Sequence, residues 1–422
     1  MPVACIIGAG VSGIAAARAL RERGIDFRGF EKGSHAGGLW RYGNDNGLSG
    51  IYESLRLNTS KALTGFPEFP MPPEYPDYPD HRQFVRYLDA AVDHFGLRES
   101  FRFGMEVARV APAGDRWSVR LADGTEGTYD AVLVASGHHW KPRRPAFPGR
   151  FSGTLLHSHE YRTPDLFRGR RVLVVGIGNS GVDIACDAAP VAAATLLSTR
   201  RGAHVLPKHL LGRPIDRWGT GLISYLPPRV QGWAIGAAVR LARGPLSSYG
   251  LPEPAHRVDQ AHPTLSSSLL ALLREGRIRA VPDVRAFEGD AVAFADGTRE
   301  PVDVVVLATG YEVSFPFLAP GLADADGLFH QVVPPSRKGL YFIGLVQPLQ
   351  GPLLRAALAQ SRWVAGLLAG TCVLPDPGRM ARTIERVRRW RETALVPSPR
   401  HSLEVNYYAY LRELAREARR RR

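Results

Sequence analysis

Two glycine-rich loops, each between an apolar run and a helical pattern, constrain the fold of this chain more than any other feature. Residues 3–13 (VACIIGAGVSG) lead into a helical pattern over 14–23, and residues 171–181 (RVLVVGIGNSG) lead into another over 182–188. A strand, a G-x-G-x-x-G turn and a helix in this order form the fingerprint of a dinucleotide-binding βαβ unit. The sequence therefore predicts two nucleotide-binding units.

A second pair of matching segments supports this interpretation. Residues 122–137 (ADGTEGTYDAVLVASG) and 295–310 (ADGTREPVDVVVLATG) align without a gap. Each has a D-G turn followed by an apolar strand that ends in a loop of small residues. Each unit thus begins with a glycine loop and closes with this element. We expect an α/β fold with two Rossmann-like dinucleotide-binding domains of the three-layer ββα type, the second inserted into the first.

The order of these elements suggests where the domains begin and end. A proline-rich connector over residues 141–148 leads from the first unit toward the second. The stretch between the second glycine loop and its closing element contains proline breaks and fits neither half. The expected boundaries are 1–143 and 302–377 for the first domain, 144–301 for the second with a helical insertion at about 206–263, and 378–422 for a basic helical segment interrupted near Pro397 and Pro399.

Composition excludes several other classes of protein. The net charge of +14 comes almost entirely from arginine, without the basic and aromatic stripe of a single-strand binder, so we expect a solvated surface and no nucleic-acid site. The three cysteines form no C-x-x-C pair, which favours a reducing, cytoplasmic location. No apolar run reaches the roughly 18 residues of a membrane span, and the first strand begins at residue 3, so we expect neither a membrane span nor a signal peptide. No metal cluster is evident, so no metal site is predicted.

The end of the second strand in each unit indicates which nucleotide binds there. In the first unit that strand (26–30) ends in Glu31, whose carboxylate suits a free ribose diol and would repel a 2′-phosphate. In the second unit residues 195–197 lead into Ser198, Thr199, Arg200 and Arg201, which suit a 2′-phosphate. The first site is therefore interpreted as FAD-binding and the second as NADPH-binding. A solvated basic loop remains the alternative for the two arginines.

Further motifs narrow the class of flavoprotein. A disulfide reductase would carry a redox cysteine pair after Gly37 and Gly38, where this chain has Leu39 and Trp40. From residue 3 to about 414 the chain resembles flavin-containing monooxygenases that oxidise amines and sulfides, without the C-terminal membrane-anchoring segment of the animal enzymes. The motifs that carry the resemblance are 37–40 (GGLW), 58–61 (NTSK), 66–70 (FPEFP), 151–161 (FSGTLLHSHEY), 308–311 (ATGY) and 344–349 (GLVQPL).

The resemblance implies a reaction. NADPH reduces FAD, the reduced flavin takes up O2 to give a C4a-hydroperoxyflavin, and this oxygenates the soft nitrogen or sulfur of a small molecule. Tyr161 and Arg162 stand where Baeyer–Villiger relatives usually carry tryptophan and proline, which favours heteroatom oxygenation. A Baeyer–Villiger monooxygenase and an NADPH oxidase that produces hydrogen peroxide remain alternatives. A flavin-bearing binding protein that uses its basic C-terminal helix is a rival from another class.

Individual residues follow from the resemblance and the motifs. Asn58 matches an asparagine beside the flavin and nicotinamide and is the candidate catalytic residue, with a turn-forming role as the alternative. Trp40 is expected to lie near the isoalloxazine, with a place in the core as the alternative. His157 is expected either to couple NADPH binding to turnover or only to anchor a linker. A helix from about Pro352 is expected to point its N-terminus at the flavin, with a core helix as the alternative. The predicted cofactor-binding residues lie in the glycine loops, strand ends and family motifs: Gly8, Ala9, Gly10, Val11, Ser12, Gly13, Glu31, Lys32, Gly38, Leu39, Trp40, Asn58, Thr59, Val107, Gly176, Gly178, Asn179, Ser180, Gly181, Ser198, Arg200, Arg201, Thr309, Gly310 and Gln360.

The substrate cannot be read from the sequence. Aromatic residues of the insertion suit a substrate pocket as well as ordinary packing: Trp218, Tyr225, Trp233 and Tyr249. The apolar surface of the larger domain is compatible with a homodimer.

Overall fold

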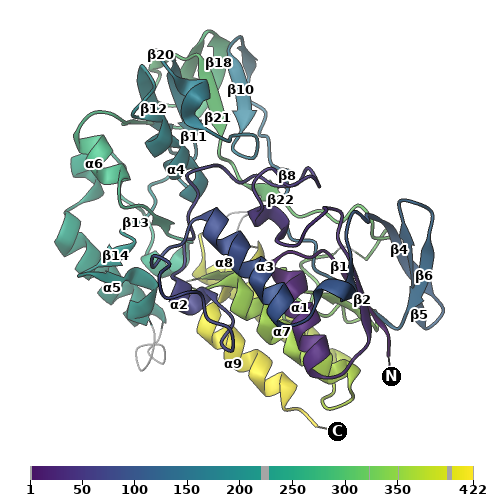
Figure 1. Ribbon diagram of the computed structural model, residues 1–422. Coiled ribbons are helices and arrows are strands. Elements are labelled where there is room, and N and C mark those ends of the chain that lie inside the picture. Colours follow the sequence, from purple (N-terminus) through teal and green to yellow (C-terminus); the bar gives the residue numbers. More distant parts are fainter. Residues whose placement is uncertain (1, 220–227, 323, 350, 397–401, 422) are drawn as a thin grey trace. The chain divides into compact units, whose positions relative to one another are not determined.

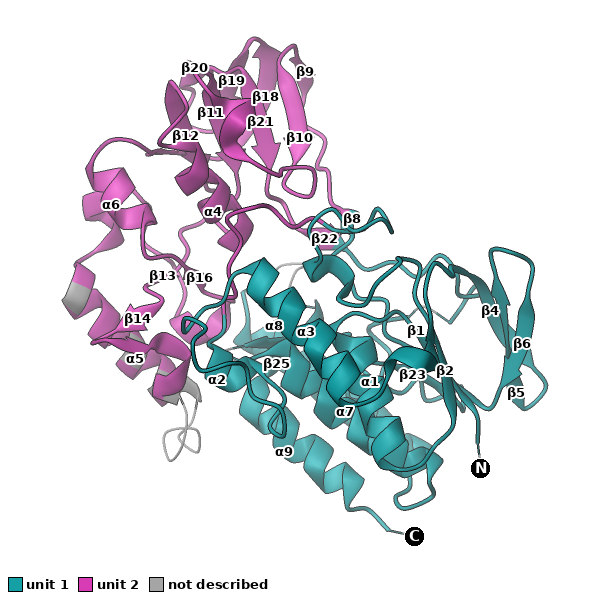
Figure 2. Ribbon diagram, in the orientation of Figure 1, with its two compact units in different colours: residues 1–49, 59–141, 312–422 teal, residues 50–58, 142–311 magenta. Residues whose placement is uncertain are grey.

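The computed structural model describes residues 2–219, 228–322, 324–349, 351–396 and 402–421 (Figure 1). The chain divides into two compact units, coloured separately in Figure 2. Unit 1 comprises residues 1–49, 59–141 and 312–422, and unit 2 comprises residues 50–58 and 142–311. The α/β fold class expected from the repeated motifs is confirmed, because each unit is built on a parallel five-stranded sheet.

The sheet of unit 1 has the strand order β23-β7-β1-β2-β3. Its strands are β1 (Ala4–Ile7), β2 (Phe27–Phe30), β3 (Phe101–Arg102), β7 (Ala131–Val134) and β23 (Leu340–Phe342). Helices α1 (Val11–Glu22) and α7 (Leu353–Leu368) pack against each other beside it. Cys5 and Ile7 of β1 pack instead with side chains of an antiparallel meander, formed by β4 (Val107–Ala113), β5 (Arg116–Leu121) and β6 (Glu126–Tyr129). Helices and meander thus make a three-layer ββα arrangement.

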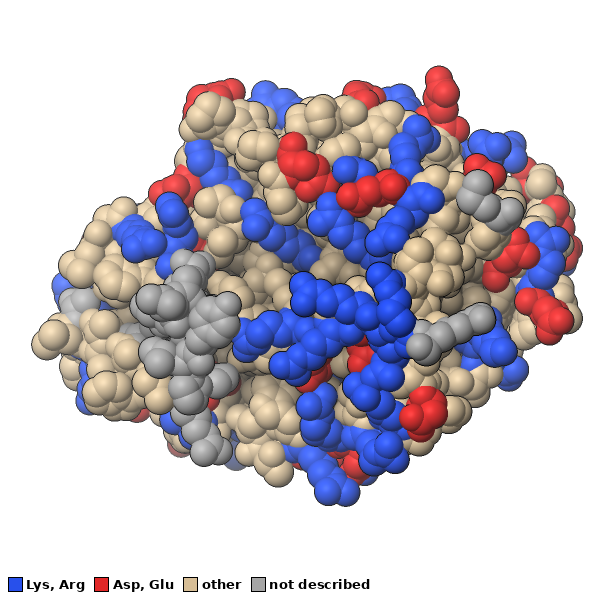
Figure 3. Space-filling model, turned by 90° about the horizontal axis from the view of Figure 1, so that it is seen from below, with Lys and Arg blue, Asp and Glu red and all other residues tan. Residues whose placement is uncertain are grey.

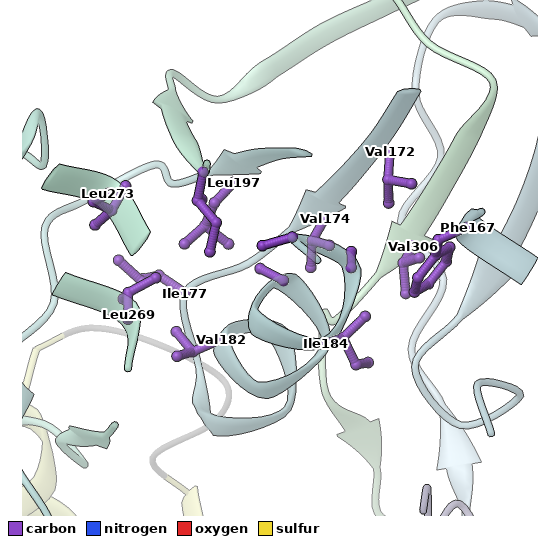
Figure 4. Close-up of a cluster of buried hydrophobic side chains, with 14 of the residues drawn as sticks. Phe167, Val172, Val174, Ile177, Val182, Ile184, Leu197, Leu269, Leu273 and Val306 are labelled. Carbon is purple, nitrogen blue, oxygen red and sulfur yellow. The ribbon is translucent and has the colours of Figure 1, made fainter. Parts of the chain in front are cut away.

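Unit 2 repeats this architecture with the strand order β10-β21-β11-β12-β17. Its strands are β10 (Thr154–His157), β11 (Arg171–Val175), β12 (Ala194–Ser198), β17 (Arg279–Val281) and β21 (Val304–Leu307). Val172 and Val174 pack with helices α4 (Asn179–Ala188) and α6 (Leu269–Arg274), as Figure 4 shows. Leu173 and Val175 face the opposite way, because side chains alternate along a strand. They pack against a four-stranded sheet of β9 (Gly149–Phe151), β18 (Val284–Gly289), β19 (Ala291–Phe294) and β20 (Arg299–Pro301).

The unit boundaries differ from those expected at three places. The longer segment of unit 2 begins at residue 142 instead of 144. Residues 302–311 stay with unit 2, since β21 pairs with both β10 and β11 in the middle of its sheet. An end of the second domain at residue 301 would remove that strand from its partners. Residues 50–58, expected in the first domain, also belong to unit 2.

The expected helical insertion contains one helix of 16 residues, α5 (Pro228–Arg243), and several short elements. The short elements are β13 (Val205–Leu206), β14 (His209–Leu210), β15 (Arg213–Pro214), η4 (Ile215–Gly219), η6 (Leu246–Tyr249) and η7 (Val258–Gln260). β13 pairs with β16 (Thr264–Leu265), which follows the insertion. Tyr225, singled out from the sequence, lies outside the described residues. Trp233 is largely exposed, so it does not line a pocket in this structure.

The C-terminal segment is helical, as its composition suggests, but also contributes a strand. Its elements are α8 (Pro377–Ala394), β25 (Glu404–Asn406) and α9 (Tyr407–Ala418), and β25 pairs with β24 (Gln347–Leu349). Pro397 and Pro399 lie outside the described residues. The remaining elements are η1 (Gly38–Trp40), α2 (Lys61–Thr64), α3 (His81–His94), η2 (Arg98–Ser100), β8 (Lys141–Pro142), η3 (Pro164–Phe167) and β22 (Tyr311–Glu312).

Arginine and lysine side chains are abundant on the face shown in Figure 3, and Asp and Glu lie among them. In α8, Arg386 pairs with Glu413 and Arg389 pairs with Glu385, both at 2.7 Å. Exposed pairs of this kind contribute little to stability and are ordinary features of a solvated surface. Among the helices of the described residues, none has the length and apolar character that crossing a membrane requires.

Candidate functional site

The first glycine loop brings the backbone of unit 1 into close contact at three points. Gly8 has a φ of +98°, and a Cβ there would lie 2.8 Å from the Ala135 carbonyl oxygen. A Cβ on Gly13 would lie 1.8 Å from the Gly8 carbonyl oxygen, and one on Gly38 would lie 2.8 Å from the Cα of Gly10. Only glycine fits at these positions. Because these residues have no side chain, the first turn of α1 lies directly against the loop.

The second glycine loop has the same geometry. Gly176 has a φ of +114°, and a Cβ there would lie 2.6 Å from the Ala308 carbonyl oxygen. A Cβ on Gly181 would lie 1.9 Å from the Gly176 carbonyl oxygen. Ala135 and Ala308 occupy equivalent positions in the aligned closing segments. The repetition seen in the sequence is therefore a repetition of backbone contacts.

The helices after these loops begin with unsatisfied donors. Gly10 precedes α1 and Gly178 precedes α4, and neither helix has a side-chain cap or an acidic residue in its first turn. Free N–H groups at a helix N-terminus, together with the helix dipole, favour an anion such as a diphosphate. The side chain of Asn179 is already used, since its Oδ1 accepts from the Leu265 amide at 2.8 Å. Thr264 likewise donates to the Ile177 carbonyl and braces this loop.

The carboxylate of Glu31 is buried at the end of β2, beside the first loop. Its Oε2 accepts from the Ala9 amide at 2.7 Å, and its Oε1 accepts from the Gly33 amide at 2.9 Å and from Asn46 Nδ2 at 3.3 Å. A carboxylate offers about four acceptor positions, so one remains for a hydroxyl group. This arrangement suits a ribose diol.

Two other predicted residues lie near this strand end. Lys32 is exposed and pairs with Glu106 at 3.1 Å. Val107 begins β4, two residues after the Met105 amide that donates to the Glu31 carbonyl. The Val107 side chain is buried in the core of unit 1 and so is not available to a nucleotide.

In unit 2 the residues after β12 separate into two roles. Ser198 is buried and its Oγ donates to the Pro282 carbonyl at 2.7 Å, so this hydroxyl braces the loop. Thr199 donates to the Arg201 carbonyl at 3.1 Å. Arg200 and Arg201 are exposed, and no carboxylate of the described chain pairs with the Arg200 guanidinium. A 2′-phosphate would find Arg200 available and Ser198 already engaged.

The loops that close the two units differ in their hydrogen bonds. In unit 2, Thr309 donates to the Arg143 carbonyl at 2.5 Å, and the Gly310 carbonyl accepts from the Arg143 amide at 2.9 Å. In unit 1, Ser136 aligns with Thr309, and its Oγ is buried without a hydrogen-bond partner, as are both ring nitrogens of the nearby His138. Thr309 and Gly310, predicted to bind a cofactor, are thus engaged within the protein. Ser136 and His138 were not singled out, although Ser136 aligns with Thr309 in the repeated closing segments.

His138 lies beside a small void, which is lined by Val134, Gly137, His138, Phe315, Ile343, Gly344 and Leu345 and is too small for a water molecule. The Gly344 main chain lies next to the ring but completes no hydrogen bond of good geometry. Burial, and after it the neighbouring His139, holds the pKa of His138 well below its usual value. The ring is therefore neutral.

Asn58 is half-buried, and its side-chain oxygen has no hydrogen-bond partner. An asparagine that stabilises a turn would use this oxygen to accept from a main-chain amide nearby. The turn-forming alternative therefore lacks its hydrogen bond. The next residue, Thr59, does have a local partner, because its hydroxyl lies 2.7 Å from that of Thr64.

Trp40 and Leu39 lie in the short helix η1. Trp40 is half-buried and packs edge-to-face on Phe84, with ring centroids 4.9 Å apart. The Leu39 carbonyl accepts from Ser49 at 2.7 Å. Trp40 has a core partner and also exposed surface, so both interpretations of this residue stay open.

Gln360 reaches the first loop only indirectly. It is fully buried in α7, where its Oε1 accepts from the Gly344 amide and its Nε2 donates to the Tyr410 hydroxyl, both at 2.7 Å. A Cβ on Gly344 would lie 1.9 Å from Ser12 Oγ, so Gly344 packs directly on the start of α1. Gln360 thus presents no exposed atom to a cofactor. Tyr410, which the sequence did not single out, connects helix α9 to this site.

The start of α7 is also determined by packing. A Cβ on Gly351 would lie 2.2 Å from the ring of Tyr407, so the glycine makes room for that tyrosine. Most of α7 is buried in the core of unit 1. These contacts favour the core-helix interpretation over a helix aimed at the flavin.

His157 is fully buried and has partners on both ring nitrogens. Its Nε2 donates to the Gly310 carbonyl at 3.1 Å, and its Nδ1 accepts from the His159 amide at 3.0 Å. Burial, helped by Arg144, lowers the pKa of His157 to about 4. A neutral histidine with two satisfied nitrogens is a structural anchor, the simpler of the two expected roles.

Comparisons with known proteins agree with this geometry. Residues 2–421 match the family described as Flavin-binding monooxygenase-like. The chain is 34% identical over 439 residues to dimethylaniline monooxygenase (N-oxide-forming) 2 of Macaca mulatta, covering 98% of this chain and 82% of that protein. The structure of S-allyl-L-cysteine S-oxygenase from Allium sativum is 26% identical, with a TM-score of 0.74 over 99% of this chain and 89% of that one. An open crystal structure of cyclohexanone monooxygenase shares the fold at 19% identity, with a TM-score of 0.74 over 99% of this chain and 98% of that one. The chain therefore belongs to the flavin-binding monooxygenase-like family of FAD- and NADPH-dependent oxidoreductases.

Proposed function

We propose that this enzyme uses NADPH and O2 to add one oxygen atom to a soft nitrogen or sulfur centre of a small molecule. The observation that carries the cofactor assignment is the contrast between two loops of the same backbone geometry. The loop of unit 1 has the Glu31 carboxylate at the adjacent strand end, whereas the loop of unit 2 has Arg200 and Arg201. The first charge suits the unphosphorylated ribose of FAD, and the second suits the 2′-phosphate of NADPH.

The residues of this chain then have distinct tasks. The free amides of α1 and α4 hold the two diphosphates, and Arg200 holds the 2′-phosphate. FAD, when bound, accepts hydride and supplies the oxygen chemistry. The protein binds, orients and keeps water away. Asn58 has an unpartnered oxygen and an amide that donates, so it is suited to hold a polar group of a cofactor in either sense.

Two observations support a nitrogen or sulfur compound as the substrate. The macaque relative is named for N-oxide formation and the garlic enzyme for S-oxygenation. Position 161 is a tyrosine whose hydroxyl donates to Asp187 at 2.9 Å, and Arg162 donates to the His159 carbonyl at 2.7 Å. These hydrogen bonds would be lost with the tryptophan and proline typical of Baeyer–Villiger enzymes. Ketone oxygenation and simple peroxide production remain the alternative reactions.

Isotope labelling tests the proposal. FAD-loaded protein is supplied with NADPH and ¹⁸O2, and separate reactions contain a tertiary amine, a thioether or a ketone. We expect one ¹⁸O atom in an N-oxide or S-oxide and NADPH consumption that matches product. Exclusive conversion of the ketone to a labelled ester would instead establish the Baeyer–Villiger alternative. Peroxide equal to NADPH with every compound would establish the oxidase. Reactions without NADPH provide the baseline.

We also infer that the enzyme works in a reducing, cytoplasmic setting. Cys5, Cys186 and Cys372 are all free thiols. Burial raises the pKa of Cys186 to about 12, so this thiol stays protonated and unreactive. A homodimer is a further proposal, and light scattering of the purified protein tests it.

A further inference from the structure

Residues 50–58 pack within unit 2 although the chain on both sides of them belongs to unit 1. Several hydrogen bonds fix this segment. The Tyr52 hydroxyl donates to Asp183 at 2.7 Å, the Ser54 hydroxyl donates to Asp187 at 2.5 Å, and the Glu53 amide donates to the Arg162 carbonyl at 2.9 Å. Asn58 is the last residue of the segment. Its position is therefore determined by the contacts of the residues just before it.

Two of these contacts end on the nucleotide-binding helix. Asp183 and Asp187 lie on α4, and Asp183 is one helical turn after Asn179, the first residue of that helix. Tyr161 also donates to Asp187, at 2.9 Å, so this carboxylate receives two hydroxyl groups. The same helix thus presents its free amides at one end and holds the segment of Asn58 along its side.

Lys208 adds a contact directly beside Asn58. It lies between β13 and β14, and its Nζ donates to the Leu57 carbonyl at 3.3 Å. Burial lowers the pKa of Lys208, and the nearby Asp183 carboxylate opposes that effect. The pKa of Asp183 is raised to about 6 by burial, against the effects of the Tyr52 hydrogen bond and of Lys208. Tyr52 therefore holds Asp183 by a hydrogen bond, whereas Lys208 holds the Leu57 carbonyl and interacts with the charge of Asp183.

We propose that Lys208 and Tyr52 are positioning residues that fix Asn58 to helix α4, so that NADP(H) binding and the placement of Asn58 are coupled. The inference rests on the proposed function for the role of Asn58 and on the contacts alone for the coupling. The Leu57 carbonyl that Lys208 contacts belongs to the peptide bond that joins Leu57 to Asn58, the candidate catalytic residue. Because coupling between two sites is reciprocal, loosening the segment must also weaken NADP+ binding.

Hydrogen exchange of residues 50–58 tests the coupling without turnover. The FAD-loaded full-length protein is measured with and without NADP+. In the natural protein we expect NADP+ to slow exchange of this segment. In Lys208→Met and Tyr52→Phe we expect exchange about 10-fold faster, the effect of losing one hydrogen bond, and NADP+ protection to shrink. NADP+ affinity should fall in both variants.

A matched control separates this effect from general loosening. Tyr249 is a buried tyrosine of unit 2 whose hydroxyl donates to the Arg243 carbonyl at 2.7 Å. The same hydroxyl accepts from Arg274 at 2.7 Å, so Tyr249→Phe removes two hydrogen bonds, neither of which involves residues 50–58. Exchange of 50–58 should therefore stay at the natural rate. If NADP+ leaves this segment unprotected in the natural protein, or if Lys208→Met exchanges like Tyr249→Phe, the inference is refuted.

Turnover provides the second readout. With an amine present, Lys208→Met and Tyr52→Phe should release more peroxide per NADPH than the natural enzyme. If exchange changes in these variants but the peroxide yield does not, the placement of Asn58 does not affect turnover. That result would overturn the role given to Asn58. If the natural enzyme forms no oxygenated product at all, the proposed function fails, while the exchange result still decides the coupling.

Discussion

Gly181→Ala is the substitution whose effect follows most directly from the structure. The added Cβ would lie 1.9 Å from the Gly176 carbonyl oxygen, where ordinary contact requires about 3.4 Å. The start of α4 must therefore move away from the loop by about 1.5 Å, the difference between the two distances. Overpacking of this kind typically costs about 1–3 kcal/mol of folding free energy. The fold of a large domain can survive that loss, so the effect on nucleotide binding can be measured.

The displacement moves the free amides of α4 from the diphosphate. A hydrogen bond to a charged group contributes about 1.5–3 kcal/mol. Loss of one such bond therefore weakens NADP+ binding about 10- to 150-fold. The loop of unit 1 is untouched, so FAD binding should not change.

Titration calorimetry of NADP+ into the FAD-loaded variant measures the first effect, and the flavin absorbance per protein measures the second. Reduction by dithionite should match that of the natural enzyme, while reduction by NADPH should need a higher concentration. Gly13→Ala is the mirror variant, because its Cβ would lie 1.8 Å from the Gly8 carbonyl oxygen, and it should lose FAD instead. NADP+ affinity within about twofold of the natural value in a folded Gly181→Ala would refute the reasoning.

Three further predictions concern other residues. Arg200→Gln should weaken NADPH binding about 10-fold or more and leave NADH unchanged, since one charge-assisted contact to the 2′-phosphate is lost; equal weakening of both nucleotides in kinetic assays would contradict this. His157 has a folded pKa of about 4 against an ordinary 6.5, so the unfolded chain binds the proton first and stability, complete above pH 6.5, falls toward pH 4. Urea unfolding of His157→Gln should show a shallower loss over that range, and an unchanged slope would exclude His157 as its source. Gln360→Leu leaves the buried Gly344 amide without its acceptor and should lower the free energy of unfolding by about 1–3 kcal/mol, together with FAD affinity, in denaturant titrations with and without FAD. An effect on stability without an effect on FAD would limit Gln360 to the core.

The two-unit architecture could be predicted because its signals are local. Within six residues, a glycine loop contains positions that only glycine can occupy, such as Gly8 with its positive φ and Gly13 in contact with Gly8. The aligned closing segments place Ala135 and Ala308 at equivalent positions, where each lies against a glycine of its loop. Charge at the strand ends, Glu31 against Arg200, is also local. All of these can be recognised without knowing what packs against them.

Other features depend on contacts between distant parts of the chain. Nothing near residue 301 indicates that β21 lies in the middle of a sheet, because that placement is decided by its pairing with β10 and β11. The hydroxyl of Ser198 could serve a phosphate or the Pro282 carbonyl, and only packing decides which. Lys208 belongs to a segment without a motif. Its contact with Leu57 joins residues that are 151 positions apart.

The interleaved arrangement of the two units has a consequence for the order in which the protein is made. Unit 2 has all its residues once position 311 has left the ribosome, whereas β7 of unit 1 still lacks its partner β23, and α1 still lacks α7. At about 5–20 residues per second, the remaining 111 residues (422 minus 311) take roughly 6–22 s to synthesise. During that interval a complete unit 2 is tethered to an incomplete unit 1. A truncation at the C-terminus would therefore damage the nucleotide loop at the opposite end of the chain.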